Sequence, residues 1–140
     1  MAAVTLDFAW LLERLGEHEE ASVLLKRGLQ KKPTAVYAWN ALAVAIAARA
    51  RRKIDLEEAL NVLLKAIELD PSRPELWSNA AAVSWSAEEH ERAKEAITHG
   101  KLLASIQERP VAMSVSAIYD VIVGGLPGQI QLDLFLDPMP

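Results

Sequence analysis

The feature that most constrains this fold is a pattern of helix, tight turn and helix, clearest in residues 56–77, LEEALNVLLKAIELDPSRPELW. Pro71 disfavours helical geometry at Asp70, and Pro74 suits the first turn of a new helix. Before this turn, apolar residues keep the spacing of one helical face: Leu56, Ala59, Leu60, Leu63, Leu64 and Ile67. The stretch is therefore predicted to hold one whole helix, a turn and the start of the next helix.

This pattern recurs on both sides of the stretch. The pairs that lie 34 residues apart are Ala59 with Ala93 and Ala66 with Gly100. The pairs that lie 38 residues apart are Ala21 with Ala59, Gly28 with Ala66, and Pro33 with Pro71. Four extra residues must therefore lie in the middle unit, between Ala43 and Ala59. Because four residues are about one helical turn, a helix can lengthen there without rotating its apolar face.

The spacing matches a known repeat signature, W-x2-L-G-x2-Y, then A-x3-F, then P, with a period of 34 residues. The matching residues of the middle unit are Trp39, Leu42, Ala43, Ile46, Ala59, Leu63 and Pro71, and Trp77 opens the next unit. On these residues the chain resembles the tetratricopeptide repeat family over about residues 2–105. The alternative is an ordinary helical bundle whose alanine spacing is coincidental.

The resemblance implies an all-α fold, a right-handed superhelix of three helix-turn-helix repeats in residues 1–107. The repeats are expected at about 2–35, 36–73 and 74–107. Their helices are expected at 2–15, 17–30, 35–51, 56–69, 75–86 and 88–105. Asp55 precedes the fourth of these helices and Glu58 follows three residues later, so Asp55 is predicted to cap it in a capping box.

The last third of the chain departs from the repeat pattern. Residues 111–123, VAMSVSAIYDVIV, are rich in β-branched side chains, so a strand is an alternative to a helix. We favour a capping helix within 108–125, because the end of a repeat array needs a cover for its apolar face. Gly124 and Gly125 should end it. In residues 126–140 apolar and polar residues alternate, which predicts an extended apolar tail.

Composition excludes several classes of function. A net charge of −4 argues against nonspecific nucleic-acid binding, and the absence of cysteine removes disulfides and thiolate metal sites. No apolar run is long enough to span a membrane, so a cytoplasmic protein is expected. No nucleophile–base–acid set or phosphate-binding loop is visible, so we expect no enzyme and no cofactor.

Three charged clusters have two interpretations each. His18 and His90 both lie among glutamates, where they indicate either carboxylate–imidazole metal binding or favourable charges in a first helical turn. The two sites are two repeats apart, so we favour the second interpretation and predict no metal. The basic run at residues 49–53 indicates either a charged contact with a partner or a solvated helix end.

The family resemblance also implies a place for a partner. In tetratricopeptide repeats the first helix of each unit lines a concave face. Carried over to this chain, that groove would be lined by Leu6, Trp10, Glu13, Tyr37, Asn40, Val44, Ala48, Ser78, Ala82, Trp85 and Tyr119. Trp10 and Trp85 can also be ordinary core residues. We favour the groove for them and for Tyr37, because large exposed aromatic side chains mark recognition surfaces.

The function predicted from these residues is a protein-interaction scaffold that binds an apolar peptide in its groove. The competing interpretation is a self-association domain, or an excised part of a larger repeat protein. The tail is too apolar to remain in water, because each buried Leu or Phe contributes roughly 1.5–3 kcal/mol. We expect it to dock on a repeat surface of its own chain, or of a neighbour's in a homodimer formed by exchange. A tail ordered only by a separate partner is the alternative.

Overall fold

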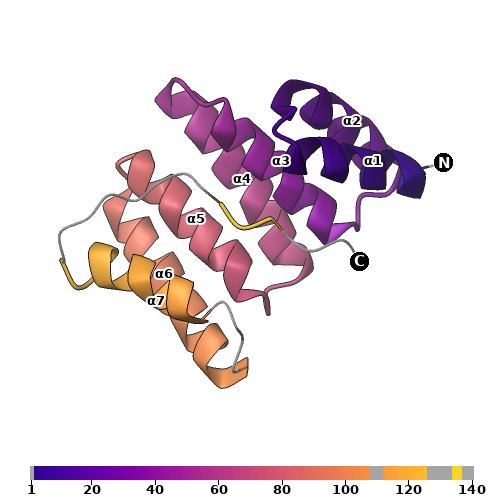
Figure 1. Cartoon of the computed structure of the whole chain (residues 1–140). Coiled ribbons are helices and arrows are strands. Elements are labelled where there is room, and N and C mark those ends of the chain that lie inside the picture. The colour runs from indigo at the N-terminus through magenta and orange to yellow at the C-terminus, as the bar shows by residue number, and fades with distance from the viewer. Residues whose placement is uncertain (1, 108–111, 126–133, 137–140) are drawn as a thin grey trace.

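The computed structural model describes residues 2–107, 112–125 and 134–136. Within these residues the chain forms seven α-helices and no strand (Figure 1). They are α1 (Ala2–Arg14), α2 (His18–Lys31), α3 (Val36–Ala48), α4 (Lys53–Leu69), α5 (Pro74–Ser86), α6 (His90–Gln107) and α7 (Ala112–Ile122). The all-α class expected from the sequence is confirmed.

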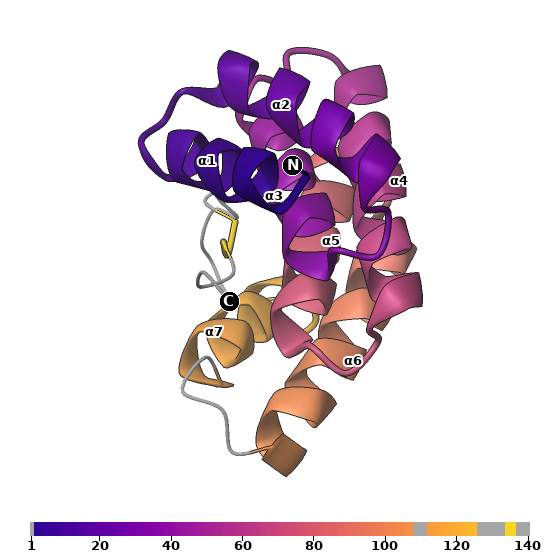
Figure 2. The same ribbon diagram turned by 90° about the vertical axis from the view of Figure 1, so that its right-hand side faces the viewer.

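The helices stack in chain order, each packing against the next, as the two views show (Figures 1 and 2). In addition α1 packs against α3, and α5 packs against α7. Helices α3 and α5 contact each other less closely than either of these pairs. The inner layer of the stack is therefore least tightly closed between α3 and α5.

Two clusters of buried apolar side chains form the core. The first joins α1, α2 and α3, around Leu6, Trp10 and Leu25. The second joins α3 to α7, around Leu63, Leu76, Ile97 and Val115. The side chains of Trp39, Ile46 and Val62 pack against both clusters, so the core is continuous along the stack.

Small residues let the helices approach closely. A Cβ atom added at Gly100 of α6 would lie 3.1 Å from Cβ of Trp77 in α5. Such a contact is tighter than side chains normally allow, so α6 can cross α5 at this distance because residue 100 has no side chain. Gly28 of α2, 72 residues earlier, is also buried.

The turns between repeats explain the recurring Pro and Trp. The indole N–H of Trp77 donates to the carbonyl oxygen of Pro71 at 2.9 Å, and that of Trp39 donates to the carbonyl oxygen of Pro33 at 2.7 Å. In both turns the tryptophan follows the proline by six residues. The spacing seen in the sequence is therefore the spacing that lets an indole hold the preceding turn.

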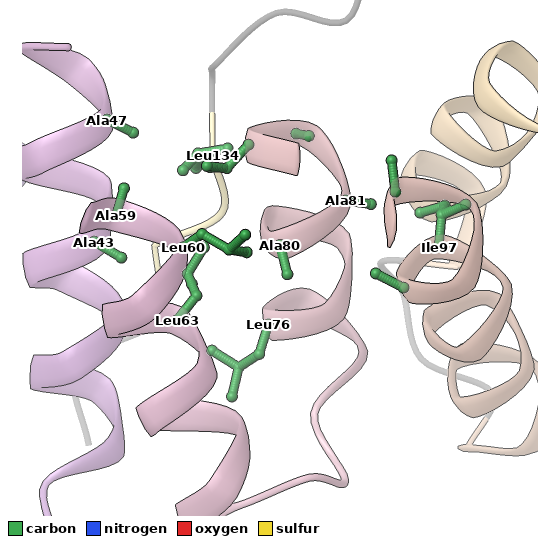
Figure 3. Close-up of a cluster of buried hydrophobic side chains, with 14 of the residues drawn as sticks. Ala43, Ala47, Ala59, Leu60, Leu63, Leu76, Ala80, Ala81, Ile97 and Leu134 are labelled. Carbon is green, nitrogen blue, oxygen red and sulfur yellow. The ribbon is translucent and has the colours of Figure 1, made fainter. Parts of the chain in front are cut away.

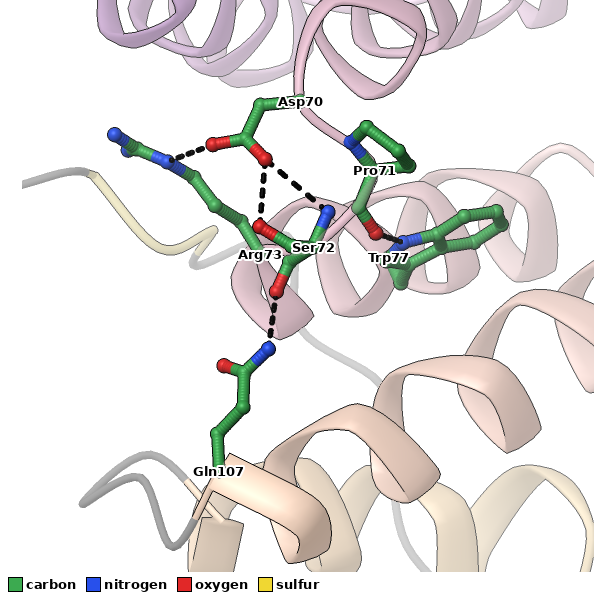
Figure 4. Close-up of polar contacts among 6 residues, drawn as sticks. All are labelled: Asp70, Pro71, Ser72, Arg73, Trp77 and Gln107. Carbon is green, nitrogen blue, oxygen red and sulfur yellow. Dashed lines mark hydrogen bonds and ion pairs between the residues drawn. The ribbon is translucent and has the colours of Figure 1, made fainter.

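Asp70 organises the second of these turns (Figure 4). Its carboxylate accepts hydrogen bonds from the backbone N–H and the hydroxyl of Ser72, at 3.2 and 2.6 Å, and from Nε of Arg73 at 3.1 Å. The side-chain bond from Ser72 is the main reason that the pKa of Asp70 is held below its ordinary value. Gln107, at the end of α6, donates to the carbonyl oxygen of Ser72 at 2.7 Å and so ties this turn to the third repeat.

The turns inside the first and third repeats share one backbone motif. The N–H of Glu17 donates to the carbonyl of Leu12 at 2.9 Å, and the N–H of Glu89 donates to that of Ser84 at 2.8 Å. These bonds are the six-to-one bonds of a Schellman helix end, which needs a left-handed residue at its centre. That residue is Gly16 (φ 84°) in the first repeat and Glu88 (φ 64°) in the third.

The middle repeat takes up its extra residues mostly in α4. This helix begins six residues before Ala59, whereas α2 begins three residues before Ala21. The prediction that Asp55 is the N-cap is therefore wrong, because the helix starts at Lys53 and Asp55 lies in its first turn, at the N3 position of a capping box whose N-cap is Arg52. Its carboxylate instead accepts the backbone N–H groups of Arg51 and Arg52, at 3.1 and 3.0 Å. The bond from Arg51 is the first cause of the lowered pKa of Asp55.

The other expected helix limits agree with the observed ones to within three residues, as is usual for helix ends. The third helix was expected to reach residue 51 and ends at Ala48, because residues 49–52 form the turn into the lengthened α4. The basic run lies in this turn: Arg52 pairs with Asp55 at 3.2 Å, and Arg49 lies 3.9 Å from Glu19. Residues 112–122 form helix α7, so the alternative of a strand is wrong there.

Candidate peptide-binding groove

The site begins with two buried asparagines that face each other across the gap between α3 and α5. Asn40 of α3 and Asn79 of α5 are 0% and 1% exposed. The side-chain nitrogen of Asn79 donates to the side-chain oxygen of Asn40 at 2.9 Å. Each amide still has hydrogen-bonding groups to satisfy, and a buried polar group without a partner is costly.

A segment from the C-terminal end of the chain satisfies those groups. Residues 134–136, which we name the docked segment, lie in neither helix nor strand. The carbonyl oxygen of Phe135 accepts hydrogen bonds from Nδ2 of Asn40 and from Nδ2 of Asn79, both at 2.8 Å. The N–H of Phe135 donates to Oδ1 of Asn79 at 2.8 Å. The two asparagines therefore bind both backbone groups of one residue.

The side chains of the docked segment alternate in their packing. Leu134, 9% exposed, belongs to the second apolar cluster (Figure 3), and Leu136 packs against the first cluster. Phe135, between them, is half-buried and among the described residues belongs to neither cluster. For residues 134–136, the prediction that the tail docks on a repeat surface of its own chain agrees with these contacts. Residues 126–133 and 137–140 of the predicted tail lie outside the described residues.

The residues expected to line the groove fall into three groups by exposure. Those that are buried are Leu6, Trp10, Glu13, Asn40, Ser78 and Ala82. Those that are half-buried are Tyr37, Val44, Trp85 and Tyr119, and Ala48 is exposed. Trp10 was expected to be an exposed aromatic side chain, and this is wrong: it is 6% exposed and belongs to the first cluster. Of this set, Asn40 hydrogen-bonds the docked segment.

Tyr37 connects the first two repeats. Its hydroxyl donates to a carboxylate oxygen of Asp7 in α1 at 2.9 Å. Burial, together with the hydrogen bond to Asp7 and its negative charge, raises the pKa of Tyr37 to about 12. The tyrosine is therefore neutral at physiological pH, and its hydroxyl is already engaged by α1.

Glu13 is a buried carboxylate paired with a histidine. It is 4% exposed, and its two oxygens lie 2.7 and 2.8 Å from Nδ1 of His18. Burial raises the pKa of Glu13, and the hydrogen bond and charge of His18 oppose that rise. The pair joins the last turn of α1 to the first residue of α2, and the carboxylate of Glu13 is buried and therefore not open to a ligand.

The other two histidines stack on aromatic rings. His90 lies 4.4 Å from Trp85 and His99 lies 4.2 Å from Trp77, measured between ring centroids. Among the described residues, no group of three or more His, Cys, Asp or Glu is placed to hold a metal ion. Nor does any helix in the described ranges have the length and apolar character needed to cross a bilayer.

Comparison with known proteins gives the fold. A family model described as "Tetratricopeptide repeat" matches residues 2–45. A solved structure of the TPR2B domain of yeast Sti1, titled as a complex with pHsp70, superposes with a TM-score of 0.74. The alignment covers 88% of this chain and 99% of that chain at 17% identity. The chain has a tetratricopeptide-repeat fold. No curated protein sequence matches it.

The fold is thus one that serves as a protein-interaction domain in the Sti1 structure, as the resemblance implied. The residue that the sequence analysis missed is Asn79, which makes three of the site's four hydrogen bonds. Its signal was an amide side chain followed at once by Ala80, Ala81, Ala82 and Val83, a run of four apolar residues. A polar residue inside such an apolar helix needs a buried partner.

Proposed function

We propose that this tetratricopeptide-repeat chain is a non-catalytic protein-interaction module that binds an extended peptide segment of a partner in its concave groove. The observation that carries the proposal is the pair of asparagines that holds the backbone of residue 135. The likeness to a domain whose structure is titled as a complex with pHsp70 further supports a partner that is a separate protein.

An asparagine pair suits this task because of what an extended peptide presents. Every residue except proline has one N–H and one C=O on its backbone, and in an extended segment neither is used by the segment itself. A side-chain amide offers both a donor and an acceptor, so Asn79 can hold both groups of one residue. The site then fixes the register of a peptide, and apolar surfaces on either side select its side chains.

Simple magnitudes indicate that such binding is reversible. Each hydrogen bond contributes about 0.5–1.5 kcal/mol net, while ordering one backbone residue costs about 1–2 kcal/mol. These two contributions nearly cancel over three residues. The net affinity therefore comes mainly from apolar burial, at roughly 1.5–3 kcal/mol for one buried leucine. A few such side chains give an affinity suited to transient binding of a partner.

A peptide selection tests the proposal. Twelve-residue peptides displayed in many copies on phage are selected against the native chain, and the enriched peptides are measured singly by fluorescence anisotropy. Three alanine variants, at Tyr37, Asn79 and Trp85, remove groove side chains one at a time. Leu102→Asp is the matched control, because Leu102 is exposed on α6.

We expect the enriched peptides to bind the native chain and the Leu102→Asp control equally, and to lose at least fivefold in affinity on Asn79→Ala. The proposal fails if no peptide is enriched. It also fails if the enriched peptides bind all three groove variants as well as they bind the native chain.

Self-association is the second candidate, and the outer face of α1 favours it. Val4, Phe8 and Leu11 are exposed, and their spacing of four and three residues places them on one face of the helix; Leu15, directly after the helix, is exposed as well. Exposed apolar stripes of this kind mark contact surfaces. Light scattering should then give twice the monomer mass of 15.4 kDa at high concentration. Phe8→Asp should return the chain to the monomer.

A further inference from the structure

The asparagine pair is already occupied by the chain's own residue 135. A partner segment that used the same two side chains would need the place of the docked segment. Both carboxamides are committed: the Phe135 oxygen accepts from both asparagines, and the Asn79 oxygen accepts the Phe135 N–H. A second backbone cannot be added without breaking these bonds.

We infer that residues 134–136 are a built-in competitor for the groove, and that the partner segment has the same chemistry. That chemistry is two aliphatic side chains two residues apart, joined by a residue with a free backbone N–H. This inference rests on the proposed function, because it takes the groove to be a peptide site.

The packing of the docked segment defines what the partner must carry. Leu134 enters the cluster of α3 to α7 and Leu136 packs against the cluster of α1 to α3, so each leucine contacts one half of the core. In an extended segment, residues two apart lie on the same side. The residue between them is held through its backbone, so its side chain is free to vary. Proline is excluded there because it has no N–H to donate.

The tether makes the docked segment an effective competitor despite its few contacts. A segment joined covalently to the chain that carries its site acts at an effective concentration that is on the order of millimolar for a short connection. The connection includes Gly125, whose φ of 69° favours glycine. A free peptide with identical contacts must therefore compete against that concentration, and the native chain should bind it only weakly.

The experiment uses the full chain and a fluorescein-labelled peptide that copies residues 129–140, QIQLDLFLDPMP. Leu134→Asp combined with Leu136→Asp disables the docked segment and leaves Asn40 and Asn79 intact. The matched control combines Leu102→Asp with Ile106→Asp, two exposed apolar residues on α6. Anisotropy should show at least tenfold tighter peptide binding by the tail variant, and native affinity for the control.

A second variant keeps the test decisive if the double substitution prevents folding, which circular dichroism would show. Phe135→Pro in the full chain retains both leucines and removes the N–H that donates to Asn79, together with a phenyl ring that belongs to neither apolar cluster among the described residues. It should bind the labelled peptide at least threefold more tightly than the native chain. Peptides altered at the same position complete the test: Phe135→Ala should bind within twofold of the parent, and Phe135→Pro should bind at least fivefold more weakly.

The outcomes separate the inference from the proposed function. If the folded tail variants bind the peptide no more tightly than the native chain, and Asn79→Ala still abolishes binding, the groove is a peptide site but the inference is wrong. If a folded tail variant binds none of the labelled peptide, the inference is also wrong, and the phage selection alone then decides the proposed function.

Discussion

The first repeat (α1 and α2) and the third (α5 and α6) carry different side chains on the same backbone turn. Residues 72 positions apart in the sequence are equivalent, since both turns form the same Schellman hydrogen bonds. The buried carboxylate of Glu13 lies 2.7 Å from Nδ1 of His18 in the first repeat, and the rings of Trp85 and His90 pack together at the same two places in the third.

The same comparison applies on the inner helices. Asp7 in α1 is equivalent to Asn79 in α5, and both hydrogen-bond to a side chain of α3. Asp7 accepts from Tyr37, so its carboxylate is used within the repeats. Asn79 pairs with Asn40 and also binds the docked segment. The repeat pattern thus sets the backbone, while the equivalent position carries a carboxylate that joins two repeats in one case and an amide that holds the docked segment in the other.

Exchanging these equivalent residues tests the comparison, and Asn79→Asp should have the largest effect. A carboxylate cannot donate to Asn40 or to the Phe135 carbonyl, and it would be buried without a positive partner. We expect a loss of about 3–5 kcal/mol in unfolding free energy at pH 7. Burial would raise the pKa of the introduced carboxyl, so part of the loss should be recovered as the pH falls. Urea unfolding at pH 7 and pH 5 measures both effects. If the Asn79→Asp variant were as stable as the native chain at pH 7, the role assigned to the amide would be contradicted.

The two histidines give the next largest effect. His18→Ala removes a hydrogen-bond partner of the buried carboxylate of Glu13, which should cost about 1–2 kcal/mol. This expected cost lies at the lower end of the penalty for leaving a buried polar group unsatisfied. The reason is that His18 is itself about one-third exposed, so water can partly replace it. His90→Ala removes a ring contact and should cost about 0.5–1 kcal/mol. Thermal unfolding of both variants measures the difference, and a larger loss at His90 would reverse the comparison.

The repeat framework could be predicted from the sequence because the contacts that form it require particular residues at fixed spacings. Trp39 and Trp77 must each lie six residues after a proline to reach its carbonyl, so the turn is visible in the sequence. The start of α4 could not be placed as well, because the extra residues allowed several helix starts. Asp55 accepts the backbone N–H groups of this turn because it lies in the first turn of the helix, and the sequence does not show where that turn begins.

The contacts of the docked segment were only partly predictable from the sequence, for a different physical reason. Alternating leucines indicated that the tail would dock, since that pattern depends on side chains. The contact with residue 135 uses a backbone N–H and C=O, which almost every residue carries, so no sequence pattern marks it. Asn79 has no counterpart of its own type at the equivalent position in the first repeat, and a repeat-based search therefore passes over it.

A smaller effect is expected from placing the first repeat's turn residue in the third. Glu88 has φ of 64°, a conformation that side chains disfavour and glycine adopts readily. Glu88→Gly should stabilise the chain by about 0.5–1 kcal/mol. Gly16→Ala should destabilise it by about 1 kcal/mol, and only through the backbone, because an added Cβ there meets nothing within 4 Å. Urea unfolding measures both variants, and a destabilising Glu88→Gly would show that the glutamate side chain contributes more than its strained backbone costs.

The smallest effect at neutral pH is expected from Asp7→Asn, which gives the first repeat the amide of the third. Tyr37 should keep a hydrogen-bond acceptor but lose the negative charge that helps to raise its pKa to about 12. Its pKa should therefore fall toward the ordinary value of 10, without reaching it, because burial, the largest cause, remains. A raised tyrosine pKa contributes stability that is fully present below pH 10 and is lost as the pH rises through about 12. The native chain should thus lose this contribution at alkaline pH, and the Asp7→Asn variant should lose less.

Tyrosinate absorbance during alkaline titration measures the shift, with a Tyr37→Phe variant isolating the signal of Tyr119. An unchanged titration of Tyr37 in Asp7→Asn would mean that burial and the hydrogen bond set its pKa, and that the negative charge at position 7 contributes nothing to it.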